Sequence, residues 1–204
     1  MANIADFKAQ MTGGGARANQ FKIFLSFPSF VTALSSSDLT SVNKAASILC
    51  KATTLPASTL ENVPVMYRGR AVNFAGERTF TPWQIEVYND ENFAVHTALT
   101  NWSTGIQSLS TTTGTTNPKD YQCDLEVVQL GRDGRALKTY RIHDAYPLEI
   151  GEIALDYETG NAIETFTCQF QYNYYTILNQ PSYVNNDKEE PSSITIPGVE
   201  TSIA

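Results

Sequence analysis

The sequence has few of the residues that metal sites, disulfide frameworks and acid–base catalysis require. Its 204 residues include three cysteines and two histidines. Cys50, Cys123 and Cys168 are far apart, and no CxxC pair is present to bind a metal or carry out redox chemistry. An odd cysteine count argues against a disulfide framework and for a reducing compartment. We therefore expect no metal site and no cofactor.

Long apolar runs are also missing. No stretch approaches the roughly 20 apolar residues that a helix needs to cross a bilayer. The first twenty residues lack the basic segment followed by an apolar segment that marks a secretory signal. We expect a protein that is made and kept in a cytoplasm, with no membrane anchoring.

Positive charge is scarce. Fourteen Lys and Arg residues against twenty-one Asp and Glu residues give a net charge of −7. This balance argues against a nucleic-acid or membrane-surface binder of the ordinary cationic kind. The densest basic cluster consists of Arg68, Arg70 and Arg78. Ion pairs with carboxylates of a partner explain this cluster better than contacts with a phosphate chain.

The patterns that mark enzymes are absent or incomplete. His143 precedes Asp144, but no GxSxG motif accompanies the pair, and adjacent residues of a strand point to opposite faces. The glycines at 13–15 are not followed by the Lys-Ser/Thr of a phosphate-binding loop. The acidic segment 156–161 lacks the ligand spacing of a calcium loop. We expect no catalytic residue and no enzymatic activity.

The sequence does contain enough apolar material for a real core. Hydrophobic residues make up 42% of the chain and aromatic residues 11%. A chain of this size buries about 70% of its surface on folding. Apolar and polar residues alternate in several segments, which is typical of half-buried strands. These segments are 21–27, 47–54, 83–87, 121–127, 137–143, 153–157 and 166–174.

One helix is predicted over residues 90–105. Val95, Leu99, Trp102 and Ile106 form an apolar stripe at helical spacing, and residues 89–91 supply a cap and an acidic first turn. The Ser/Thr-rich segment 29–44 is interpreted as a loop with at most one short helical turn. The fold class is therefore mainly β (α+β), an antiparallel β-barrel or sandwich-like protomer with one flanking helix.

A long segment, residues 55–80, fits neither strand nor helix periodicity well. Its apolar content argues against disorder, and Pro56 and Pro64 keep it from joining a central sheet. We expect an extended, hairpin-like excursion that packs against something outside its own barrel. The predicted organisation is an N-terminal arm (1–20), one domain (21–175) and an extended C-terminal tail (176–204).

Short segments along the chain form an ordered series. They are CKATTLPA at 50–57, AGERTF at 75–80, NDE at 89–91, YP at 146–147, GEIALDY at 151–157 and IETF at 163–166. The series resembles the tail tube protein of contractile-tailed bacteriophages, the myovirus-type inner tube, over about residues 21–175. Segment 29–44 and the residues after 175 depart from the family pattern, so no role carries over to them.

The resemblance implies a structural protein that forms homohexameric rings, which stack into a tube inside a contractile sheath and conduct the genome through the host envelope. The implied partners are other copies of the chain, the tail sheath protein, a baseplate tube-initiator and a tail terminator. The tape-measure protein and genomic DNA would occupy the lumen without specific binding. The implied location is the virion, after assembly in the bacterial host cytoplasm.

Other functions remain open from the sequence. A tube of a type VI secretion or other contractile injection system would share fold and assembly, and so would a baseplate tube-initiator. A monomeric ligand-binding barrel is the remaining alternative.

The excursion carries the predicted inter-subunit interface. Met66, Tyr67 and Phe74 would serve as anchors, and the arginines would pair with carboxylates across the contact. The predicted interface residues are Leu60, Val63, Met66, Tyr67, Arg68, Arg70, Phe74 and Arg78.

Overall fold

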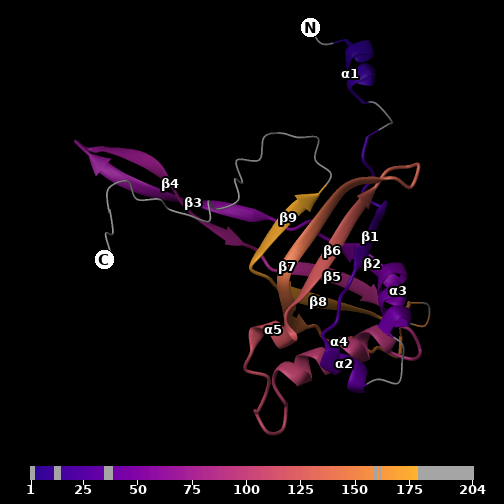
Figure 1. Ribbon diagram of the computed structural model, residues 1–204. Helices are drawn as coiled ribbons and strands as arrows, with labels where there is room; N and C mark the ends of the chain where they lie inside the picture. Colours follow the sequence, from indigo (N-terminus) through magenta and orange to yellow (C-terminus); the bar gives the residue numbers. More distant parts are fainter. Residues whose placement is uncertain (1–2, 12–14, 35–38, 159, 161, 179–204) are drawn as a thin grey trace, which may run out of the picture.

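The computed structural model describes residues 3–11, 15–34, 39–158, 160 and 162–178. Most of the predicted C-terminal tail, from residue 179 onward, lies outside these residues. Seven strands form one antiparallel sheet in the order β1-β6-β7-β8-β5-β2, and β9 pairs with β7 (Figure 1). The strands are β1 (Phe21–Phe24), β2 (Cys50–Thr53), β5 (Trp83–Tyr88), β6 (Cys123–Leu130), β7 (Ala136–Ile150), β8 (Thr165–Gln171) and β9 (Tyr174–Leu178).

Strand β7 joins the two halves of the sheet. Its first part pairs with β6 and β9, and its last residues, from Tyr146 to Ile150, pair with β8. Because β7 changes partners along its length, the sheet curves, and its two halves pack on the same core. The mainly antiparallel β fold expected from the sequence is confirmed.

The core follows the alternation of the strands. Trp83, Ile85 and Val87 of β5 are fully buried, whereas Gln84 is exposed and Glu86 is half-buried. The ring of Trp83 packs against the ring of Phe170 in β8, with 5.5 Å between centroids. Period-two alternation therefore identified the buried face of these central strands.

Five helices occur in the described residues, rather than the single one predicted. Helix α4 packs against both α2 and α3, and α3 and α4 also pack against the sheet (Figure 1). The helices are α1 (Ile4–Gln10), α2 (Ser29–Leu34), α3 (Leu39–Leu49), α4 (Ala94–Ile106) and α5 (Pro118–Tyr121). None of them is long and apolar enough to cross a bilayer.

The interpretation of segment 29–44 as a loop is wrong. Helices α2 and α3 occupy its described part, and α3 also takes the first residues of the strand expected at 47–54. Val42 and Ala46, one helical turn apart, are buried in the core. Burial of this stripe outweighs the weak helix propensity of the surrounding Ser and Thr residues.

The structure also differs from the sequence prediction at the start of α4 and at residues 153–157. Helix α4 begins at Ala94 rather than at residue 90, because Asp90 begins a turn that precedes the helix. Its carbonyl accepts a hydrogen bond from the Phe93 amide at 2.9 Å, and its Oδ1 accepts one from the Ala94 amide at 3.0 Å. The strand expected at 153–157 does not form. Leu155 and Tyr157 alternate correctly but are exposed, and no strand of the described residues pairs with them.

The expected excursion is a β-hairpin. Strands β3 (Ser58–Tyr67) and β4 (Arg70–Phe80) pair only with each other and project away from the barrel-like body (Figure 1). Nothing in the described residues tests the proposed division into arm, domain and tail, although the arm contains the helix α1.

Candidate assembly surface

The hairpin β3–β4 brings the predicted interface residues into one element. Its strands end in a two-residue turn formed by Arg68 and Gly69, whose φ angles are 49° and 80°. Such left-handed pairs match the twist of a hairpin, and glycine adopts this conformation without steric cost. The turn fixes the register, in which Tyr67 faces Arg70.

The register gives the hairpin two different faces. Val63 faces Phe74, and Val65 faces Val72, so these cross-strand pairs lie on one side together with Tyr67. We call this side the apolar face. The residues of the opposite side, the mixed face, are Asn62, Pro64, Met66, Ala71, Asn73 and Ala75.

A hydrogen bond between two of its residues supports the assignment of the mixed face. The Asn62 side-chain amide donates to Oδ1 of Asn73 at 3.1 Å, which requires both side chains to lie on the same side. Met66 is therefore on the side opposite to Tyr67 and Phe74. The three anchors expected from the sequence do not form one cluster, since strand alternation separates Met66 from the other two.

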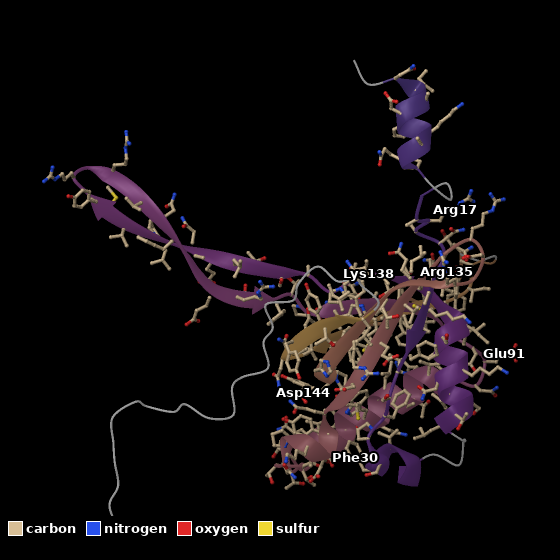
Figure 2. All side chains as sticks on the ribbon, turned by 45° about the horizontal axis from the view of Figure 1, so that its top comes forward. Arg17, Phe30, Glu91, Arg135, Lys138 and Asp144 are labelled. Atoms are coloured by element: carbon tan, nitrogen blue, oxygen red, sulfur yellow. The ribbon has the colours of Figure 1, made fainter. Side chains whose placement is uncertain are left out.

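Side chains on both faces of the hairpin are exposed to solvent. The exposed fraction is 63% for Tyr67 and 56% for Phe74, and the side chains project on both sides of the ribbon (Figure 2). An isolated two-stranded hairpin is only marginally stable in water. Large contiguous apolar patches on a monomer mark interaction sites. The apolar face has the character of a surface that a partner covers.

The three arginines have different surroundings. The guanidinium carbon of Arg68 lies 5.4 Å from the centroid of the Tyr67 ring. Arg78 donates from Nη1 to the Ser58 hydroxyl at 3.1 Å, at the base of the hairpin. Within the described part of the chain, none of Arg68, Arg70 and Arg78 forms an ion pair. Arg68 and Arg70 are thus available at the tip for carboxylates of a partner.

Aromatic side chains fix the base of the hairpin to the body. The ring of Phe80, at the end of β4, packs against those of Tyr172 and Tyr175 at 5.7 and 5.8 Å. The Tyr172 hydroxyl donates to the Ala57 carbonyl at 3.4 Å. Burial raises the pKa of this hydroxyl to about 12, so it remains a donor at all physiological pH values. Tyr172 and Tyr175 therefore hold the base of the hairpin against the body.

His143 has a structural explanation. Its Nδ1 lies 3.1 Å from an Asp124 carboxylate oxygen and its Nε2 lies 2.9 Å from the Thr176 hydroxyl, while its ring stacks on Tyr174. The histidine links β6, β7 and β9 and does not pair with the adjacent Asp144. Within the described residues, no group of three potential metal ligands gathers here or elsewhere.

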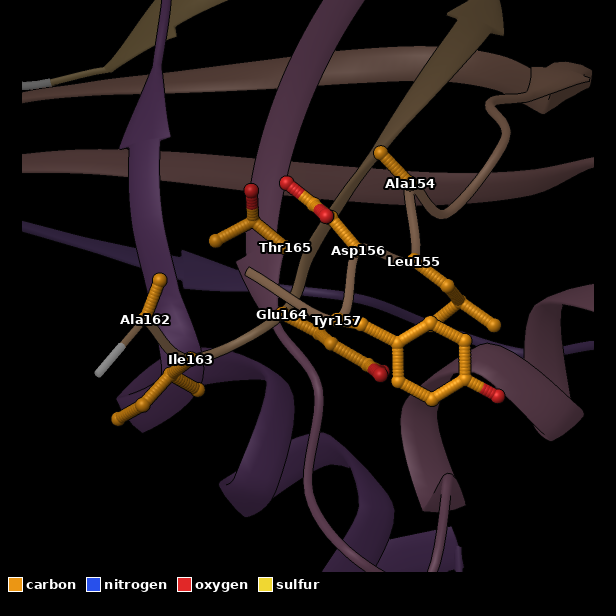
Figure 3. A pocket seen from close by; sticks show the side chains of 8 residues that line it. All are labelled: Ala154, Leu155, Asp156, Tyr157, Ala162, Ile163, Glu164 and Thr165. Carbon is orange, nitrogen blue, oxygen red and sulfur yellow. The ribbon is translucent and has the colours of Figure 1, made fainter. Parts of the chain in front are cut away.

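A second exposed apolar region lies beside the barrel. A cavity of about 760 Å³ is formed by residues 154–157 and 162–165 (Figure 3). Leu155, Tyr157 and Ile163 are exposed around it, with the carboxylates of Asp156 and Glu164 among them. Asp156 Oδ1 accepts a hydrogen bond from the Glu158 amide at 3.0 Å, as in a turn. The sequence prediction missed this region because its alternation was assigned to a strand.

Known proteins share sequence with this chain. A family model described as phage tail tube protein matches residues 16–178. The tail tube protein gp19 of Enterobacteria phage T4 is 32% identical over 127 residues, which cover 62% of this chain and 78% of gp19. The tail tube protein of Serratia phage KSP90 is 27% identical over 174 residues, which cover 84% of this chain and 95% of that protein.

Solved structures share the fold. A chain in the baseplate of the anti-feeding prophage has a TM-score of 0.55 at 13% identity and covers 80% of this chain and 95% of its own length. A chain in the sheath/tube terminator of the extracellular contractile injection system PVC has a TM-score of 0.56 at 12% identity, with coverages of 80% and 96%. At such low identity these similarities concern the fold alone.

Proposed function

Because the chain belongs to the phage tail tube protein family, we propose that it forms hexameric rings that stack into the inner tube of a contractile tail. The role is structural and involves no catalysis. One observation carries the proposal of self-assembly, namely the apolar face of the hairpin β3–β4, which stands away from its own core. A neighbouring copy in the same ring or the next ring would cover this face.

Open strand edges support the same proposal. In the part of the chain that the structure describes, β1, β2 and β9 each pair on one side only. Unpaired edges promote uncontrolled association, and joining them between neighbours removes that hazard. A heterologous contact that closes produces a ring, and stacking of rings produces a filament.

The proposed partners follow from the position of a tube within a tail. They are the sheath protein outside the tube, a baseplate tube-initiator at one end and a terminator at the other. The tape-measure protein and the genome would pass through the lumen unbound. The protein would be assembled in the host cytoplasm and would then remain in the virion.

A tube that injects protein cargo is the second candidate. Such a tube would share the fold, which chains of the anti-feeding prophage and the PVC system also have. The neighbouring genes distinguish the two candidates, since a phage tail requires capsid and genome-packaging genes. The sequence relatives support the phage tail.

Sedimentation and pelleting of the purified chain test self-assembly. At tens of micromolar protein, we expect rings or longer assemblies, either spontaneously or after seeding with tube fragments. A chain that remains monomeric with seeds present would contradict the proposal. Seeding is needed as a control because an unseeded monomer could be waiting for its initiator.

A further inference from the structure

Helix α1 carries an apolar stripe that no other described part of the chain buries. None of its residues is buried, and Ile4 and Phe7 are 73% and 65% exposed. Ile4, Phe7 and Met11 follow one another at i, i+3 and i+7, so their side chains share one side of the helix. Figure 1 shows α1 standing apart from the barrel-like body. The helix also lies outside residues 16–178, which match the family model.

The charges of α1 are arranged asymmetrically. Lys8 borders the apolar stripe, because it lies one turn after Ile4 on the same side. Asp6 lies toward the opposite side, and its carboxylate accepts a hydrogen bond from the Asn3 amide at 3.1 Å. Among the ion pairs of the described residues, none involves Lys8. The helix therefore presents an apolar stripe with a cationic edge.

The cavity formed by residues 154–157 and 162–165 has the complementary character. Leu155 and Ile163 are 78% and 71% exposed at its rim, and Tyr157 is also exposed. Asp156 and Glu164 contribute negative charge beside these apolar groups (Figure 3). The cavity is open to solvent, and its volume of about 760 Å³ lies within the range of clefts that bind drug-sized ligands.

We propose that α1 of one copy docks on the cavity formed by residues 154–157 and 162–165 of a neighbouring copy. Ile4, Phe7 and Met11 enter the apolar part, and Lys8 pairs with the carboxylate of Asp156 or Glu164. This inference rests on the proposed self-assembly, which brings other copies within reach. The N-terminal arm of each copy then binds a neighbouring copy, in addition to the contact that the hairpin β3–β4 makes.

Cross-linking between two full-length chains tests the docking. One chain carries Phe7→Cys, the other carries Ile163→Cys, and the mixture is assembled and then oxidised mildly. A disulfide requires the two Cα atoms to lie about 4.4–6.8 Å apart, so it reports direct contact. We expect a covalent dimer in severalfold greater yield than in the matched mixture of Ala9→Cys with Ile163→Cys, because residue 9 lies on the opposite side of α1.

The possible outcomes separate the docking from tube formation, which electron microscopy follows in the same samples. Tubes without an excess of dimer over the Ala9→Cys control overturn the docking and leave the tube intact. If neither the wild-type chain nor the variants form tubes with seeds present, the proposed function fails. A specific dimer in that mixture would still support docking, whereas the absence of a specific dimer overturns the docking as well. A double variant, Phe7→Cys with Ile163→Cys, that closes within one monomer also overturns the exchange.

Two further variants test whether the cross-link depends on the chosen cysteine position and on the proposed ion pair. Leu155→Cys replaces Ile163→Cys as a second position on the cavity and should give the same preference for Phe7→Cys. Lys8→Glu, added to the Phe7→Cys chain, should lower the dimer yield severalfold, because it places a carboxylate against carboxylates. An unchanged yield overturns the assigned ion pair.

Discussion

At the scale of single residues, the three cysteines lie in surroundings that favour the neutral thiol. Burial raises the pKa of Cys50 to about 12 and that of Cys123 to about 11, and it raises the pKa of Cys168 as well. The thiolate is the reactive species, so at pH 8 Cys123 should hold about 100-fold less thiolate than an ordinary thiol. We expect slow alkylation by iodoacetamide in the native protein and fast alkylation of all three cysteines in urea, measured by mass spectrometry. Equal rates for Cys123 in both conditions would contradict the assigned burial.

Gly105 makes a close helix contact possible. A Cβ atom at this position in α4 would overlap the ring of Phe30 in α2. Overpacking typically costs about 1–3 kcal/mol, and the better helix propensity of alanine returns at most about 1 kcal/mol. We expect Gly105→Ala to lower the free energy of unfolding by up to about 2 kcal/mol, as measured by chemical denaturation. Gly160→Ala is the control, because no atom lies near its added Cβ, and its effect should stay within about 0.5 kcal/mol. Equal stability of the two variants would contradict this expectation and would show that α2 moves to make room for the added methyl group at little cost.

At the scale of elements, the two faces of the hairpin β3–β4 should differ in their role in assembly. Val65→Asp places a charge on the apolar face, whereas Asn73→Asp makes a nearly isosteric change on the mixed face. Burying an unpaired carboxylate in a contact is costly, so Val65→Asp should abolish pelletable tubes and Asn73→Asp should preserve them. Both variants should unfold at the wild-type temperature, because neither residue belongs to the core. Normal tubes from Val65→Asp would show that the apolar face is not an interface.

The elements with a clear local pattern of apolar and polar residues were the ones that the sequence predicted correctly. Strands β5 and β8 were identified from the alternation of residues such as Ile85 and Phe166, and α4 was identified from its stripe. Helix α3 was not predicted, because the segment around Val42 and Ala46 is rich in Ser and Thr residues. Its apolar stripe is recognised only from the burial of these two residues in the structure. Leu155 and Tyr157 alternate as a strand would, yet no neighbouring strand is available to pair with them. The separation of Met66 from Tyr67 follows from strand alternation, which was not applied because residues 55–80 were not predicted as strands. The register, which the turn at Gly69 fixes, places Phe74 on the same face as Tyr67.

At the scale of the whole molecule, the net charge of −7 should govern the behaviour of the lumen. We expect a net-negative inner surface and no measurable affinity of assembled tubes for duplex DNA at physiological salt, because like charge lets the duplex slide. Co-sedimentation of tubes with labelled DNA over a range of salt concentrations measures this affinity. Tight binding that weakens steeply with salt would contradict the prediction.

Electron microscopy of the purified assembly tests whether this chain builds a tube from hexameric rings. We expect hollow filaments whose end views and averaged sections show six-fold rings, with the hairpin β3–β4 covered by a neighbouring copy. Particles of a single protomer, or rings of another symmetry with the hairpin still exposed, would contradict it.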